Sequence, residues 1–368
     1  MRRDGQLGLS NFAGGVLAAA VLTMLFGAGA TNSALAQVPD APPRIAFEIA
    51  TGSTTGTYFP VGQSIAQLLS HPPGVQRCEA ADACGPAGLI VSTRATAGSS
   101  ANVAVVNSGM SNSALAQADA VAMAIAGLGS FAKTGRASLL RVIAKLYGED
   151  VHLIAAKDAK ISRVSDLRGK RVGLSTEGSG TIVTSRAILS AYRLNERTIV
   201  PNYDPSDRAI DLLHSGQLDA LFFVGGSPVN LVEQLLNGGT AMLVPIDGQG
   251  RERLLMSQPR LSARSIPEGT YESLPAIDTV GVDALWITNE AESETLVYAM
   301  VKALLNPANR SAFEQVRAGA HFLDPAFAVP EGLPVHPGAM RYFVEAGLAK
   351  PPEVKDSPPP AGRLPNKS

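Results

Sequence analysis

The sequence predicts an α/β protein with two lobes built on mainly parallel sheets. Its 368 residues are enough for two domains of roughly 100–200 residues each. Strand patterns alternate with helix patterns, which is typical of α/β folds. A second unit with the same order of elements begins near Asp166.

The composition limits the class of protein. The chain is 45% hydrophobic with a net charge of −1, which is too apolar and too weakly charged for a disordered chain. It has no excess of positive charge, so we do not expect nucleic acid as a partner. Aromatic residues make up only 5%, which argues against a surface that stacks bases.

The N-terminus has the layout of a secretory signal peptide, spanning residues 1–36. Arg2 and Arg3 precede an apolar segment at 12–30, and Ala34-Leu35-Ala36 offers a cleavage site. An uncleaved membrane anchor is the alternative, but the small residues and the A-x-A ending favour cleavage after Ala36. We therefore expect the mature chain in the periplasm.

The first unit, 44–152, is expected to form the first part of lobe 1. Its apolar patterns predict strands at 44–50, 89–93, 142–146 and 151–155 and helices at 61–69 and from Gly98 to near Gly109.

The second unit, 153–278, is expected to form lobe 2. The patterns predict strands at 171–175 and 220–224, a helix at 182–194 and another ending at Leu236. Residues 279–350, with a strand at 279–288 and a helix at 292–305, are expected to return to lobe 1. The Pro-rich, charged segment 351–368 is expected to be disordered.

The two cysteines, Cys78 and Cys84, flank a short loop. In an oxidising compartment such neighbours are expected to form a disulfide that pins the loop. The five histidines are scattered along the chain, so neither they nor the cysteines predict a metal site.

Three loops rich in Gly, Ser and Thr follow predicted strands, at 51–58, 178–181 and 225–228. Ligands bind at the carboxyl ends of strands in open α/β sheets, and free N–H groups at helix starts bind anions. Each loop alone could be an ordinary turn with a capping hydroxyl. Three such loops spread over both units favour a ligand site.

No catalytic motif accompanies these loops. The 177–181 loop lacks the lysine of a P-loop, and no dinucleotide-binding glycine pattern or nucleophile elbow occurs. Glu48, Glu79 and Glu149 are isolated acids that we interpret as surface or capping residues. The sequence therefore predicts no catalytic residues, no cofactor and no bound metal.

With these residues in place, the chain resembles the TAXI-type solute receptors of TRAP (tripartite ATP-independent periplasmic) transporters. The matching segments run co-linearly through nearly the whole mature chain. They are 51–62, 114–119, 146–153, 166–172, 177–181, 216–220 and 336–339.

The resemblance implies a type II periplasmic-binding-protein fold, in which hinge strands join two lobes and the ligand lies in the cleft. It implies a small carboxylate ligand, glutamate-like or a dicarboxylic or oxo-acid, and delivery to a membrane permease driven by an ion gradient. By position it assigns ligand contacts to Ser53, Thr54, Thr57, Tyr58, Ser99, Asn102, Gln117, Ser179, Gly180, Thr181 and Pro228.

Arg94 and Arg208 are candidates for a carboxylate clamp. We expect the receptor to act as a monomer. The alternatives are a periplasmic sensing adaptor for a signalling partner and an enzyme on the same fold.

Overall fold

The structure is a computed structural model that describes residues 43–75, 83–272, 274–313, 316 and 322–351. The predicted signal peptide with its cleavage after Ala36 lies outside these residues, as does the tail beyond residue 351. Cys84 is described and Cys78 is not, so the disulfide between them stays a prediction.

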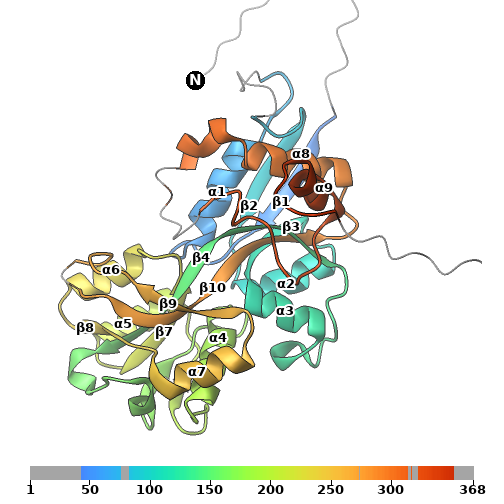
Figure 1. The fold of residues 1–368 in the computed structure, drawn as a ribbon. Helices are drawn as coiled ribbons and strands as arrows, with labels where there is room; N and C mark the ends of the chain where they lie inside the picture. Colours follow the sequence, from blue (N-terminus) through green and yellow to red (C-terminus); the bar gives the residue numbers. More distant parts are fainter. Residues whose placement is uncertain (1–42, 76–82, 273, 314–315, 317–321, 352–368) are drawn as a thin grey trace, which may run out of the picture. The chain divides into compact units, whose positions relative to one another are not determined.

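Strands and helices alternate along the described chain (Figure 1). The strands are β1 (Ile45–Ala50), β2 (Leu89–Arg94), β3 (Ser113–Gln117), β4 (Leu140–Ala156), β5 (Arg171–Gly173), β6 (Val200–Asn202), β7 (Ala220–Gly225), β8 (Ala241–Val244), β9 (Leu261–Ile266) and β10 (Ile277–Asn289). The α-helices are α1 (Tyr58–Leu69), α2 (Ser99–Asn107), α3 (Ala118–Ala126), α4 (Thr181–Ala191), α5 (Ser206–His214), α6 (Asn230–Asn237), α7 (Gly248–Ser257), α8 (Glu294–Leu304) and α9 (Pro337–Glu345).

Two long strands, β4 and β10, belong to both halves of the sheet (Figure 1). Residues 284–288 of β10 pair with β3. Beyond β3 in the sheet lies β1 and then β2. The last residues of β4, 150–156, pair with β7 and β8, and β7 leads to β5 and β6. This confirms the predicted α/β fold, with two lobes joined by crossing strands.

The sheet is mixed, which corrects the expectation of mainly parallel strands. The pairs β1–β2, β1–β3, β5–β6 and β5–β7 are parallel, but β4 and β10 pair with each other and with the other strands in antiparallel fashion. The two short strands predicted at 142–146 and 151–155 are one strand, β4. Gly148 lies within it, and the Arg264 guanidinium packs where a side chain would stand.

The buried apolar side chains form three clusters: one lies in the first lobe, one in the second, and one extends from α2 and α3 to α4 and α7. In the first lobe, α1 places Val61, Ile65 and Leu69 on one buried stripe at helical spacing. Trp286 of β10 is fully buried there, and its indole N–H donates to Ser113 Oγ at 3.0 Å.

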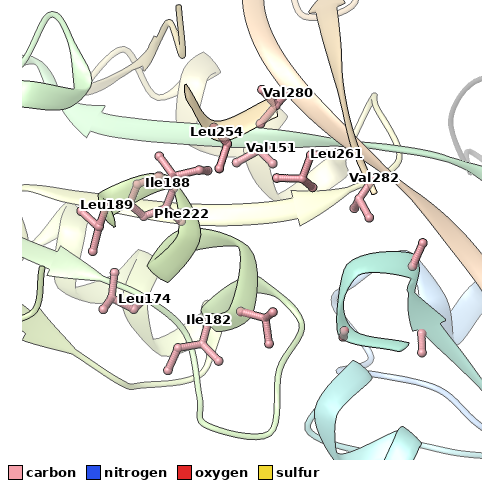
Figure 2. Packing of buried hydrophobic residues seen from close by; sticks show 14 of the residues in the cluster. Val151, Leu174, Ile182, Ile188, Leu189, Phe222, Leu254, Leu261, Val280 and Val282 are labelled. Atoms are coloured by element: carbon pink, nitrogen blue, oxygen red, sulfur yellow. The ribbon is translucent and has the colours of Figure 1, made fainter. Parts of the chain in front are cut away.

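In the second lobe, helices α4 and α7 cover apolar side chains of β4, β7 and β10 (Figure 2). Val151 and Phe222 come from the sheet, and Ile188 and Leu254 from the helices. No helix in the described ranges combines the length and the apolar character needed to cross a bilayer.

Asn102 of α2 links the end of β1 to β3. Its side chain is fully buried, and its Nδ2 lies within hydrogen-bond reach of the carbonyl oxygens of Ala50, Thr51 and Leu115. Its Oδ1 accepts from the Thr96 hydroxyl at 2.7 Å. The amide is thus fully used by the scaffold, which corrects the prediction that Asn102 contacts the ligand.

Replacing Asn102 with Ala should destabilise the fold. Buried carbonyls would lose their donor, and one buried group left without a partner costs about 1–3 kcal/mol. The free energy of unfolding, measured in urea, should fall by at least that amount. Asn237→Ala on the exposed end of α6 is the control, with a change within about 0.5 kcal/mol. Equal effects of the two substitutions would contradict the assignment.

Candidate ligand-binding site

Four helices begin at one cavity of about 450 Å³. The first residues of α1, α2, α4 and α5 are Tyr58, Ser99, Thr181 and Ser206, and all four line the cavity. Two of these helices follow strands of the first lobe and two follow strands of the second, as expected for a site at the carboxyl ends of strands.

The N-cap residues of these four helices provide no side-chain cap. None of the N-cap residues Thr57, Gly98, Gly180 and Pro205 accepts a hydrogen bond through its side chain. In α4 the Ile182 N–H donates to Ser179 Oγ at 3.2 Å. The first N–H groups of a helix lack partners within the helix and carry partial positive charge. The cavity therefore concentrates positive potential without a charged side chain.

The loop before α4 packs directly on the start of α2. Ala101 N–H donates to the carbonyl of Gly178 at 3.0 Å, and the Ser100 hydroxyl donates to the carbonyl of Ser179 at 3.1 Å. Gly98 has a φ of 119°, and a Cβ there would lie 3.2 Å from Ser179 Cα. Glycine at this position lets the two loops form one wall of the cavity.

Gln117, at the end of β3, brings a buried donor to the same wall. Its side chain is 3% exposed, and its Nε2 has no hydrogen-bond partner among the described residues. A Cβ added to Gly180 would lie 1.5 Å from Gln117 Oε1, so the amide occupies the space that this glycine leaves open. A buried donor without a partner carries a free-energy penalty, which a ligand acceptor would remove.

Glu149 of β4 also lines the cavity and is only 2% exposed. The Tyr58 hydroxyl donates to Glu149 Oε2 at 2.9 Å. Burial raises the pKa of Glu149 to about 8, the Tyr58 hydrogen bond opposes this rise, and the charge of Asp119 adds to it. This corrects the interpretation of Glu149 as an isolated surface or capping residue.

None of the described residues that line the cavity is Lys, Arg or His. Arg94 pairs with Glu48 at 2.9 Å, and Arg208 lies 4.0 Å from Asp211. Neither arginine lines the cavity, so the structure does not place the suggested carboxylate clamp there.

The structure brings together nine of the predicted contact residues. Those lining the cavity are Ser53, Thr54, Thr57, Tyr58, Ser99, Gln117, Ser179, Gly180 and Thr181. Asn102 is used by the scaffold, as described above. Pro228 instead lines a separate cavity of about 830 Å³ along α1 and β2.

Sequence reasoning missed Glu149, Ser206 and Asp207, all of which line the cavity. The sequence signal for Glu149 was an acidic pair inside an otherwise apolar strand pattern. A strand that is apolar along its length is buried on both faces, so an acid within it is expected to be buried as well. The signal for Ser206 and Asp207 was Pro205-Ser206-Asp207, a polar helix start of the same kind as the three glycine-rich loops.

The comparisons agree on the fold. A model of the NMT1-like family matches residues 49–347. The structure of MatC from Rhodopseudomonas palustris with bound malate shares 15% identity at a TM-score of 0.50, over 83% of this chain and 97% of that one.

Two further structures are also similar. The alkanesulfonate-binding protein SsuA from Xanthomonas axonopodis pv. citri shares 14% identity at a TM-score of 0.42, over 83% of this chain and 85% of that one. The amino acid transporter substrate-binding protein AbpA from Streptococcus pneumoniae shares 15% identity at a TM-score of 0.41, over 74% and 92%.

Replacing Glu149 with Gln should stabilise the ligand-free protein increasingly as the pH rises. The unfolded carboxyl ionises near its ordinary pKa of 4.5, but the folded one holds its proton until about pH 8. Between these values the folded state binds more protons, so wild-type stability falls with rising pH. The melting temperature of Glu149→Gln should therefore exceed that of the wild type by more at pH 8 than at pH 5.

The matched control is Glu345→Gln on α9. Glu345 also accepts a tyrosine hydroxyl, that of Tyr298 at 2.6 Å. The hydrogen bonds from Tyr298 and Arg341 lower the pKa of Glu345, so its replacement should give no gain that grows with pH. A pH-independent difference at Glu149 would show that this carboxyl does not titrate as described.

Proposed function

Since the chain belongs to the NMT1-like family, we propose that it is an extracytoplasmic receptor that captures a small carboxylate and delivers it to an ion-gradient-driven TRAP permease. The observation that carries this proposal is the convergence of four helix starts on one cavity. In this role the protein binds and releases its ligand without breaking a bond.

The cavity suits a small anion for two physical reasons. Each helix start stabilises negative charge by about 0.3–1 kcal/mol, and by more where the site is partly buried. Gln117 Nε2 and the hydroxyls of Ser99 and Thr181 supply donors that can hold carboxylate oxygens. The volume, about 450 Å³, lies within the range of small-molecule sites.

The route of export and delivery is supported by sequence. The predicted signal peptide at 1–36 would direct the chain to the periplasm. The resemblance to TAXI-type receptors is the basis for proposing a permease as the partner. MatC, with the same fold, was solved with malate, which is a small carboxylate. Strands β4 and β10 run through both lobes and are the proposed hinge for closure around the ligand.

Gly180→Ala should abolish ligand capture. The new methyl group would overlap Gln117 Oε1 and lie 2.5 Å from Ser99 Oγ, which displaces two cavity donors. The mature wild type, screened by thermal shift against amino acids, dicarboxylates and oxo-acids, should melt at a higher temperature with its ligand in a concentration-dependent way. The variant should lose that shift.

Gly238→Ala after α6 is the control for this substitution. Its backbone is helical and an added Cβ would make only ordinary contacts, at 3.5 Å or more. It should keep the full ligand-induced shift. If Gly180→Ala kept the full ligand-induced shift in melting temperature, the ligand would bind elsewhere. If wild-type protein, refolded to remove carried ligand, showed no shift with any compound, the result would argue against the proposed ligand class.

Deleting the gene in its host should abolish uptake of the ligand identified in this way. A sodium ionophore should stop uptake in the parent strain, since the proposed permease runs on an ion gradient. Uptake that continues in the deletion strain, with loss only of a ligand-dependent transcriptional response, would favour the sensing adaptor instead.

A further inference from the structure

We propose that Glu149 determines the specificity of the cavity by selecting ligands with a protonated amino group, and that its proton leaves when such a ligand binds. This inference rests on the proposed receptor function and narrows it. The ligand class becomes amine-bearing carboxylates, such as amino acids, in place of dicarboxylates and oxo-acids.

The cavity lining supplies two kinds of polar group. Helix starts and the unpartnered Gln117 Nε2 supply donors. Glu149 supplies a buried carboxyl, held by the hydroxyl of Tyr58 at the start of α1. No described lining residue carries a positive charge to balance that carboxyl. A ligand that carries both a carboxylate and an ammonium group satisfies both kinds of group.

The groups around Glu149 leave its negative charge uncompensated. The acids Asp119 of α3 and Asp150 of β4 act on it repulsively, Tyr147 lies beside it on β4, and Asp207 of α5 lines the same cavity. Buried charges are tolerated when they are paired. An ammonium group of the ligand would provide the missing pair.

Arg264 of β9 is the cation that acts on Glu149 from nearby, but it is already engaged. Its guanidinium packs against Gly148 and donates to Asp283 at 3.3 Å. Successive residues of a strand point to opposite faces, so a group stacked on Gly148 lies across the sheet from the Glu149 side chain.

A dicarboxylate fits this arrangement less well. Its second carboxylate would lie near Glu149, Asp119 and Asp150, and it could remain there only while Glu149 kept its proton. A protonated amino group at the same place would be attracted to these acids instead of repelled by them. The cavity should therefore prefer an amino acid to the same acid without its amino group.

Binding should also be linked to pH. Burial keeps the Glu149 carboxyl protonated at neutral pH, with a pKa of about 8, whereas pairing with an ammonium group requires the ionised form. Binding therefore releases close to one proton at pH 7. By linkage, the affinity for an amine-bearing ligand should weaken as the pH falls below about 8, by up to about tenfold per pH unit.

The test uses matched probe pairs on the mature wild-type protein: L-glutamate with glutarate, L-aspartate with succinate, and L-leucine with 4-methylpentanoate. Titration calorimetry at pH 7 in phosphate and in Tris, which differ in ionisation enthalpy, gives the number of protons released. The amine-bearing member of the pair that binds should be favoured at least tenfold and should release close to one proton.

Glu149→Gln should lose at least tenfold in affinity for that amino acid, release no proton and bind the amine-free acid at least as well as the wild type. Glu345→Gln should behave like the wild type. Tighter binding of the amine-free acid, or proton release that persists in Glu149→Gln, would overturn the inference and leave the receptor function intact. Failure of every probe to bind would overturn both.

Discussion

The antiparallel pairing of β4 with β10 is the constraint on which the rest of the structure depends. The two strands pair from Asn289 with Leu140 to Gly281 with Asp150, and each then continues into pairings with other strands. The buried apolar side chains form three clusters, and β4 contributes residues to each of them. All four helix starts of the candidate site follow strands that connect to this pair through one or two neighbouring strands.

A second constraint is the burial of acids near the crossing strands. Asp119 accepts the Thr184 hydroxyl at 2.7 Å, and burial raises the pKa of Asp119 to about 6. Glu149 has a similar relation to Tyr58. In both cases the partner of the acid is a neutral hydroxyl from a different element of the fold, so neither acid is fixed in its ionised form. Glu149 also lines the cavity, and a buried acid with a shifted pKa at a cavity is typical of functional sites.

The sequence predicted the parts of the molecule that depend on local pattern. β1, β7 and the helices α1 and α4 stand out because their apolar spacing is regular, and the hydroxyl-rich loops mark nine cavity residues because they follow strands. β3 was missed because Ser113–Gln117 is short and consists mostly of small residues. β4 was predicted as two separate strands because Gly148 interrupts the apolar pattern. In the structure the Arg264 side chain, which comes from another strand, fills the space beside this glycine.

The role of Glu149 could not be predicted locally, because Tyr58, the residue that holds it, is 91 positions away in the chain. Pattern reasoning assigns an isolated acid to the surface, since buried acids are uncommon. Asn102 shows the opposite difficulty. A polar residue in a ligand-like segment was expected to face the ligand, but its amide lies within hydrogen-bond reach of two carbonyls at the end of β1 and one within β3.

The position of Glu149 on a crossing strand has a consequence for how this receptor could be retargeted. Several hydroxyls of the cavity, such as those of Ser53 and Thr54, lie in a loop, where a change of length or residue disturbs few neighbours, so the shape of the accepted ligand can change readily. The carboxyl lies on the strand that contributes residues to all three apolar clusters. Variants of the loops would therefore explore many ligand shapes while keeping the same demand on ligand charge.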